Sequence, residues 1–554
     1  MDNVKILALG GLDEDGKNMY LVEVEDDIFV IECGLKYPDP KEQLGVESII
    51  PDFKYLIENK HRVKGIFITH GHDDVMKALP YLLKDAVFDV YATALTAKII
   101  EKELTSHKLK NKVKVISRNG SFNIGKHKII TFPIMQSIAD GIGLAINTKY
   151  GSIVYTSEYI FDYDYLNINF AGDVNVINDI GKNGVLALLS ESVGAVRSGY
   201  TSPRHKISST VEPFFETAQG RIVVSVYKQN LYRIIEILEL AYKYQRRVFV
   251  HDRDQMQILK MVNELGYYHL NSSKMISEKE FNNSDEDVLV LVGGSGNRVF
   301  KKLHKMAIGE DNLIEFRDTD TIIIASPVVP GTEKAAAKME DDLYKAKVNI
   351  FKVKAKEVLS MHASVEDLKM MLYLLKPKYY IPVKGDYRAL IENANVAVSM
   401  GYTPDKVVVL DNGQIASFEN GRLKSTKDFI KLEDSLIDGN DRLDIGGMVL
   451  KDRETLSTDG AIVIGVVLNH KTKELIGGPD IQSRGVIYLK DAEYVIAEVG
   501  NILLRTIKEA VADKRYENMA VRMEAKEKIT KYLLKEIGKR PMILPAIVEI
   551  NIGE

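Results

Sequence analysis

Apolar runs along the chain predict an α/β protein. In the first 200 residues, short β-branched runs at Val4–Leu9, Met19–Val24 and Ile28–Glu32 predict strands. Between such runs, Met76–Lys84 and Thr93–Leu104 repeat their apolar residues at helical spacing. Many strands with helices outside them are typical of a layered α/β arrangement.

From about residue 205 the pattern changes to a regular alternation of strands and helices. Strands are predicted at Arg221–Val226, Arg247–Val250, Asp287–Val292 and Thr321–Ala325, with helical segments between them. This alternation is typical of βαβ units and predicts a parallel sheet.

The remaining chain divides into three parts. Residues 355–420 hold a predicted helix at Val365–Leu375 and predicted strands at Tyr379–Val383 and Val407–Leu410. Residues 421–447 are rich in Lys, Asp and Gly and have weak periodicity, so we expect a linker there. Residues 448–554 predict a small α/β domain with elements at Ala461–Leu468, Val486–Leu489, Tyr494–Val511, Val521–Ile537 and Ala546–Ile550.

Composition narrows the class of protein. The chain has 554 residues, which predicts three or four domains, and its net charge of −4 excludes a strongly basic nucleic-acid coat. A single cysteine excludes a disulfide framework and a Cys-based zinc site, and suits the reducing cytoplasm. No apolar run approaches 18 residues and the N-terminus lacks a charged-then-apolar leader, so we expect neither a membrane span nor a secretory signal.

The segment with the clearest chemistry contains two histidines one residue apart. His70 and His72 follow a predicted buried strand and precede a helix, and Asp74 lies two positions further on. The spacing alone is also compatible with two ordinary loop histidines. The strand–loop–helix context favours a metal site, because it turns both imidazoles and the carboxylate toward one cavity.

This segment resembles the His-x-His-x-Asp-His signature of metallo-β-lactamase-fold hydrolases, and the whole chain resembles the ribonuclease J family. Within that family, the resemblance is closest to a second, degenerate paralogue that some bacteria carry beside a more active one. The likeness is carried by Leu9–Gly11 with Gly16–Tyr20, Gly65–Pro80, Ser190–Tyr200, Pro330–Lys334, Ser360–Ser364, Leu374–Arg388 and Gly478–Gly485.

The resemblance implies a fold and an activity. The expected fold is an α/β metallo-β-lactamase αββα sandwich formed by residues 1–204 and 355–420, with an inserted β-CASP α/β domain at 205–354. The C-terminal domain, 448–554, supports association in the family. The family's activity is 5′→3′ exoribonuclease action with some endonuclease activity in RNA maturation and decay, and it depends on two Zn or Mn ions.

Departures from the family pattern concentrate at the expected metal ligands. His70, His72 and Asp74 are retained, and Glu158 takes the place of the bridging Asp. Three expected histidines are replaced, by Val75, Gln136 and Lys384. The first metal position therefore keeps His70 and His72, with Glu158 as a candidate third ligand and Gln136 as a weak one. The second keeps Asp74, with Glu158 as its other candidate, and has lost both imidazoles. We therefore expect a marginal first site and no effective second site, the alternative being that the chain binds no metal at all.

Lys384 suggests how the remaining carboxylates are compensated. An ammonium has no lone pair and cannot bind a metal, but a buried carboxylate pair needs a counter-charge. We therefore hypothesise that Lys384 pairs with Asp74 or Glu158, the alternative being that Lys384 points into solvent. A separation of more than about 6 Å from both carboxylates would exclude the pairing.

Other family motifs are also altered. Glu191 stands for the first β-CASP acid, the alternative being a plain surface carboxylate, and Arg298 replaces the acid of the second motif in the loop Gly293–Arg298. His362 is retained, where the family uses a proton donor or phosphate ligand, the alternative being a structural histidine. The substrate-binding segment that the resemblance implies consists of Val358, Leu359, Ser360, Met361, His362, Ala363 and Ser364.

Basic and aromatic residues of the middle domain suggest an RNA-binding groove, since phosphate contacts need only clustered cations. The alternative is a set of solvated helix faces. The candidates are Arg221, Tyr227, Lys228, Tyr232, Arg233, Arg246, Arg247, Arg298, Lys301, Lys302 and Lys305.

Two main functions follow from these observations. In the first, the chain has little or no nuclease activity and is a cytoplasmic, RNA-binding and structural subunit of a complex with the active paralogue. The other expected assembly is a homodimer or tetramer that forms through the core and the C-terminal domain. In the second, it is a weak one-metal exoribonuclease that uses His70, His72 and Glu158. A small-molecule hydrolase is disfavoured, because a small substrate needs neither the inserted domain nor the C-terminal part.

Overall fold

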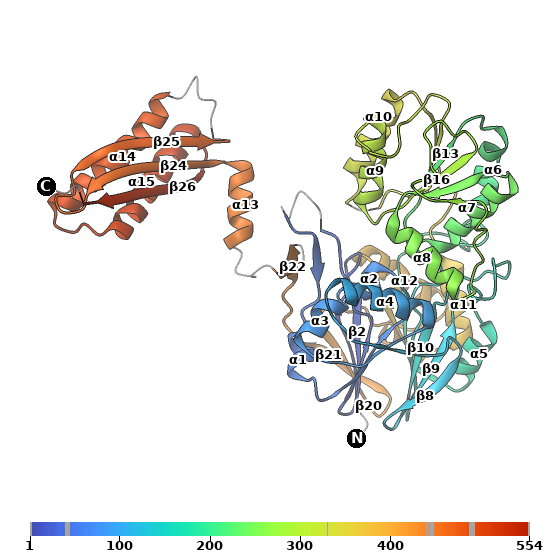
Figure 1. The fold of residues 1–554 in the computed structure, drawn as a ribbon. Helices are drawn as coiled ribbons and strands as arrows, with labels where there is room; N and C mark the ends of the chain where they lie inside the picture. Colours follow the sequence, from blue (N-terminus) through green and yellow to red (C-terminus); the bar gives the residue numbers. More distant parts are fainter. Residues whose placement is uncertain are drawn as a thin grey trace. The chain divides into compact units, whose positions relative to one another are not determined.

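The chain forms two compact units, the first from residues 1–38 and 47–440 and the second from 39–46 and 441–554. Figure 1 shows both in a computed structural model. The structure describes residues 3–38, 45–329, 331–438, 441–442, 448–486 and 493–551.

Two β-sheets packed face to face form the base of the first unit. The first sheet has eight strands in the order β21 (Arg422–Phe429), β20 (Gln414–Glu419), β1 (Asn3–Gly10), β2 (Met19–Val24), β3 (Asp27–Ile31), β5 (Val63–Ile68), β6 (Val90–Ala92) and β7 (Val113–Val115). The second has six, in the order β19 (Tyr379–Val383), β12 (Val185–Glu191), β11 (Gly151–Tyr155), β10 (Ile142–Thr148), β9 (His127–Pro133) and β8 (Gly120–Ile124). Because side chains alternate along a strand, Ile6, Phe29 and Leu144 meet in the core between the sheets.

Helices cover the outer faces of both sheets and complete the predicted αββα sandwich. Leu56, Leu82 and Ile100 pack against the first sheet, on α1 (Lys54–Glu58), α3 (Leu79–Asp85) and α4 (Ala94–Ser106). Three helices cover the second sheet: α5 (Val174–Lys182), α11 (Val365–Leu375) and α12 (Tyr387–Ser399). Ile177 of α5 and Leu372 of α11 pack against that sheet. Two shorter helices are α2 (Asp73–Met76) and the 3₁₀ turn η1 (Pro404–Lys406).

The inserted domain lies in the sequence between β12 and β19, two neighbouring strands of the second sheet (Figure 1). It is an α/β domain whose strands are all parallel, as its alternating pattern predicts. Its strands lie in the order β15 (Met275–Ile276), β14 (Arg247–Val250), β16 (Val288–Val292), β13 (Ile222–Ser225), β17 (Thr321–Ile324) and β18 (Asn349–Lys352). Its helices are α6 (Ser208–Thr217), α7 (Leu231–Lys243), α8 (Arg253–Glu264), α9 (Asn297–Ala307) and α10 (Glu333–Lys345).

The second unit is a three-stranded sheet packed against two long helices. Its central strand β24 (Ala461–Asn469) pairs antiparallel with β25 (Leu475–Arg484) and parallel with β26 (Met542–Ile550). Ile464 and Leu503 are buried in its core, which also includes residues of α15. The helices of this unit are α13 (Met448–Thr458), α14 (Glu493–Ala512) and α15 (Asn518–Ile537), and the short strand β23 covers Asp441–Arg442.

The structure differs from the expected elements in two places. The expected linker at 421–447 instead contains β21, an edge strand of the first sheet, and β22 (Ser435–Asp438), which pairs with β4 (Ser48–Ile50). The expected strand at Val407–Leu410 forms only an isolated bridge from Val407 to Tyr380. Pro330 of the family likeness, and 487–489 of the expected strand Val486–Leu489, lie outside the described residues. Among the helices that the structure describes, none is long and apolar enough to cross a membrane.

Candidate metal centre

The residues that the sequence singles out meet where several strands end. His70 and His72 follow β5, Glu158 follows β11, and Lys384 follows β19. Strands β11, β12 and β19 run parallel to one another, so their carboxyl ends lie at one edge of the sheet. Loops at such an edge are free of the sheet ladder, which lets polar side chains converge there.

His70, His72 and Glu158 form a cluster that can hold one divalent ion. His70 Nε2 lies 3.6 Å from Glu158 Oε1, and His72 Nδ1 lies 3.3 Å from Glu158 Oε2. The three ligand atoms all lie within 4.8 Å of one another. His70 Nε2 is buried without a hydrogen-bond partner among the described residues, as expected of an atom that ligates an ion. Two imidazoles and a carboxylate are a ligand set that suits zinc.

Hydroxyl groups fix the orientation of both imidazoles. The hydroxyl oxygens of Thr69 and Ser157 lie 2.9 and 3.1 Å from His70 Nδ1, and the Ser137 hydroxyl oxygen lies 3.1 Å from His72 Nε2. Partners of this kind set the tautomer and ring direction of ligating histidines. Sequence reasoning missed all three residues, although each adjoins a position that the family pattern marks.

Lys384 pairs with both candidate carboxylates. Its Nζ lies 2.8 Å from Asp74 Oδ2 and also donates a hydrogen bond to Glu158 Oε1. The predicted ion pair is therefore confirmed, and the alternative of a solvent-facing lysine is excluded, because the side chain is only 5% exposed. Burial alone would raise the pKa of Glu158, but the ammonium holds that pKa well below its ordinary value. The two carboxylates likewise outweigh burial and raise the pKa of Lys384.

The backbone around Lys384 is held from two sides. Lys384 has a left-handed conformation, with φ at 54°. Its N–H donates to the Gly11 carbonyl at 3.0 Å, and its own carbonyl accepts from Ser192 N–H at 2.9 Å. Asn18 donates from Nδ2 to Asp74 Oδ2 at 2.9 Å. The N-terminal loop with the family likeness thus fixes both the lysine and one of its partners.

The vacated ligand positions do not fit a second ion. Val75 is fully buried in the hydrophobic core. Gln136 is buried, and neither atom of its amide has a hydrogen-bond partner among the described residues. Asp74 is the one carboxylate outside the His70, His72 and Glu158 cluster, and Lys384 bonds both it and Glu158. The site therefore fits one ion and not two.

A buried carboxylate orients the retained histidine. Glu191 Oε2 lies 2.7 Å from His362 Nδ1, and Glu191 Oε1 accepts hydrogen bonds from the N–H groups of Ala363 and Tyr159, both at 2.9 Å. Glu191 is 1% exposed, so it is not a surface carboxylate. Burial disfavours a charged imidazole, but Glu191 and Glu158 outweigh it and raise the pKa of His362 above its ordinary value.

The expected substrate-binding segment is largely enclosed by protein. Five of its seven side chains are buried: Val358, Leu359, Met361, Ala363 and Ser364. Arg197 supports the segment by donating to the Ser360 hydroxyl oxygen at 3.1 Å and to the His362 carbonyl at 2.9 Å. Only Ser360 and His362 keep partly accessible side chains, so these two are left to face a ligand.

The expected basic groove of the inserted domain is smaller than the sequence suggests. Arg221, Arg233 and Arg246 are buried and bonded to protein groups, as is Asp320 opposite Arg221. Tyr232 is also buried. Tyr227 donates its hydroxyl hydrogen to a backbone carbonyl, and three further cations pair with carboxylates: Lys228, Arg247 and Lys302. The exposed cations that remain are Arg298, Lys301 and Lys305 on α9.

A further buried acid, Glu32, lies behind His70 and was not predicted. It follows β3, is fully buried, and accepts hydrogen bonds from the N–H of Thr69 at 3.2 Å and from the Thr69 hydroxyl. The same hydroxyl lies next to His70 Nδ1. Burial raises the pKa of Glu32 to about 8, although the Thr69 hydrogen bonds lower it in part.

Glu32 predicts an unusual dependence of stability on pH. Its raised pKa means that, between about pH 5 and 8, the folded chain binds a proton that the unfolded chain releases. The free energy of unfolding of the wild type should therefore fall, relative to Glu32→Gln, by up to about 1.4 kcal/mol per pH unit as the pH rises through that window. Urea unfolding in EDTA at several pH values measures this. Glu58→Gln, at an exposed position, should show no such trend, and a flat Glu32→Gln difference would contradict the assignment.

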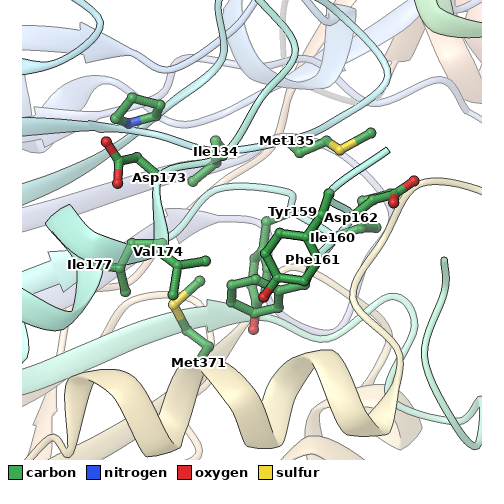
Figure 2. A pocket seen from close by; sticks show the side chains of 13 residues that line it. Ile134, Met135, Tyr159, Ile160, Phe161, Asp162, Asp173, Val174, Ile177 and Met371 are labelled. Atoms are coloured by element: carbon green, nitrogen blue, oxygen red, sulfur yellow. The ribbon is translucent and has the colours of Figure 1, made fainter. Parts of the chain in front are cut away.

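A separate cavity adjoins the site but shares no ligand with it. Figure 2 shows its lining, in which Ile134 and Met135 lie opposite Val174, Ile177 and Met371. The cavity has a volume of only about 20 Å³. Its two carboxylates already have partners: Asp162 accepts the Asp164 N–H at 2.9 Å and lies 3.5 Å from Lys206 Nζ, and Asp173 caps α5. Its walls are mainly apolar, so we do not assign the chemistry of the chain to it.

Comparison with family models gives matches along nearly the whole chain. They are the metallo-beta-lactamase superfamily over residues 12–213, the ribonuclease J beta-CASP domain over 219–343, the Zn-dependent metallo-hydrolase RNA specificity domain over 347–408 and the ribonuclease J C-terminal domain over 448–550. These descriptions imply metal use, which agrees with the His70, His72 and Glu158 cluster.

Curated relatives match over the same length. Ribonuclease J 2 of Staphylococcus epidermidis is 32% identical over 551 residues, covering 99% of this chain and 98% of the relative. Ribonuclease J2 of Bacillus subtilis is 32% identical over 552 residues, covering 99% of each. A crystal structure of a protein of unknown function from Enterococcus faecalis shares the fold alone, with a TM-score of 0.54, 14% identity, and coverage of 75% of this chain and 100% of that one. Together, the domain matches and the full-length relatives show that this chain belongs to the ribonuclease J family.

Proposed function

We propose that this chain binds RNA but has little or no two-metal nuclease activity, and that it is a structural subunit beside an active ribonuclease J paralogue. The observation that carries the proposal is Lys384, which bonds both carboxylates that a second ion would need. The match to an RNA specificity domain over residues 347–408 supports RNA as the ligand. Such a role would place the chain with its RNA in the cytoplasm.

The chemical reason lies in what two ions do and a lysine cannot. Two ions roughly 3.5–4 Å apart stabilise the attacking and the leaving oxygen of a phosphodiester together. An ammonium supplies positive charge, but it has no open coordination position for water. In this chain Lys384 pairs with both Asp74 and Glu158. His70, His72 and Glu158 remain to hold a single Zn or Mn ion, which would supply Lewis acidity when bound.

A weak one-metal exoribonuclease is the second candidate function. The cluster of His70, His72 and Glu158 and the intact Glu191–His362 pair favour it. Glu191 accepts at His362 Nδ1 and raises the pKa of the imidazole, so His362 can carry a proton for a leaving oxygen. This residue pair needs no second ion for that step.

An assay on 5′-monophosphorylated RNA with Mn²⁺ separates the two candidates. We expect the wild-type chain to retain RNA in a filter-binding measurement, while its hydrolysis rate stays close to that of His70→Ala. A robust rate that His70→Ala abolishes would reject the structural role in favour of the weak nuclease. Co-purification with the active paralogue tests the proposed assembly, and failure to associate at micromolar concentrations would contradict it.

A further inference from the structure

The inserted domain contacts the loop between the two candidate metal-ligating histidines. Gln229, two residues before α7, donates from Nε2 to the Gly71 carbonyl at 3.0 Å and to Asp73 Oδ1 at 2.6 Å. Gly71 lies between His70 and His72, and Asp73 directly follows. One amide group of the inserted domain therefore bonds the loop on both sides of His72.

Asp73 is a firm anchor for that contact. Its carboxylate is buried, and its Oδ2 accepts the Tyr37 hydroxyl at 2.6 Å and lies 3.3 Å from Lys77 Nζ. With Oδ2 engaged by Tyr37 and Lys77, Oδ1 is left to accept from Gln229. Hydrogen bonds to an ionised acceptor are stronger than those between neutral groups, so the contact resists displacement.

A second contact reaches His72 from the same segment of the inserted domain. The Tyr232 N–H, in the first turn of α7, donates to the Ser137 carbonyl at 2.8 Å. The hydroxyl oxygen of Ser137 lies 3.1 Å from His72 Nε2. The segment at the start of α7 therefore reaches His72 in two ways. Ser137 connects Tyr232 to the His72 imidazole, and Gln229 contacts the carbonyl of the peptide that joins Gly71 to His72.

We propose that Gln229 is a positioning residue of the metal centre, through which the inserted domain sets the affinity of His70, His72 and Glu158 for a divalent ion. Residues that hold ligating histidines from outside typically change metal affinity 10–100-fold when they are removed. Loss of the Gln229 contacts would free the Gly71 peptide, and His72 would lose part of its fixed direction. The inference concerns metal binding and does not depend on whether the chain cleaves RNA.

Zn²⁺ titration of the full chain by calorimetry tests the proposal. We expect Gln229→Leu to raise the dissociation constant at least about 10-fold. Gln257→Leu, on an exposed face of α8 in the same domain, is the matched control. Its Zn²⁺ dissociation constant should stay within about twofold of the wild-type value, because Gln257 does not hold a ligating histidine. Loss of binding in His70→Ala identifies the site, and the visible absorption of bound Co²⁺ should change in Gln229→Leu but not in the control.

Thermal unfolding of the metal-free variants separates positioning from folding. If Gln229→Leu folds normally and its Zn²⁺ affinity and Co²⁺ spectrum match the wild type, the proposal is overturned. If that variant does not fold, Gln229→Asn replaces it, with the same two outcomes. Absence of Zn²⁺ binding by the wild-type chain would equally overturn the proposal.

Discussion

Replacing Lys384 with methionine is expected to lower the free energy of unfolding by about 3–5 kcal/mol. Methionine keeps most of the length of the side chain but removes its charge. Asp74 and Glu158 would then face each other without a counter-charge, and the Glu158 side chain is only 4% exposed. Breaking a buried ion pair from one side is costly because the other charge stays in the protein interior. Urea unfolding at pH 7 in EDTA measures the difference.

The pH dependence of that difference provides an internal check. Lys384 holds the pKa of Glu158 below its ordinary value, so the stabilisation is present above about pH 4.5 and is lost as the pH falls through the lowered pKa. The difference in the free energy of unfolding between wild type and Lys384→Met should therefore become smaller at acid pH. Lys182→Met removes an exposed ion pair with Asp179 and should cost less than about 1 kcal/mol. Equal stability of wild type and Lys384→Met would show that the buried pair is not needed.

Much of the fold could be predicted from the periodicity of apolar residues. The parallel sheet of the inserted domain follows from short runs such as Val288–Val292, in which every residue is buried. Strand β21 could not be predicted in this way, because it is an edge strand with mostly exposed or half-buried side chains. Its charges are typical of protected sheet edges, and in the sequence they resemble a linker.

The candidate site was predictable only where strand ends position residues directly. Glu158 and Lys384 each follow a strand of the same sheet, so the family resemblance was enough to predict that their side chains meet. Gln229 and Asp73 are 156 positions apart, and their contact depends on how two domains pack. Residue type likewise gave no measure of burial for Arg221, which carries a charge but is fully enclosed beside Asp320.

Restoring four residues together should recover a two-metal centre. We expect Val75→His, Gln136→His, Glu158→Asp and Lys384→His in one chain to raise the metal content from at most one ion to two. RNA hydrolysis should rise at least about 100-fold, which is the effect typical of one restored electrostatic contact to a transition state. Elemental analysis of the purified protein and the rate on 5′-monophosphorylated RNA measure the two effects.

The same chain with Lys384 retained is the matched control. It carries the three other substitutions, and we expect it to bind no second ion, because the ammonium still occupies Asp74 and the shortened carboxylate. If the fourfold variant binds two ions without any gain in rate, the substrate path has diverged as well as the ligands. If it binds no second ion although it is folded, the cavity has been remodelled beyond the four positions.

The N-terminal strand has a consequence for how this chain folds during synthesis. Strand β1 pairs with β20, joining Asn3 to Glu419, so β1 is an unpaired edge of the first sheet until more than 400 residues have been made. At about 5–20 residues per second, that interval lasts roughly 20–80 s. An unpaired strand edge is a template for aggregation, and contacts this distant along the chain form slowly. All strands of the inserted domain lie between Ile222 and Lys352. This domain can therefore fold on the ribosome before the later strands β19 and β20 complete the αββα sandwich.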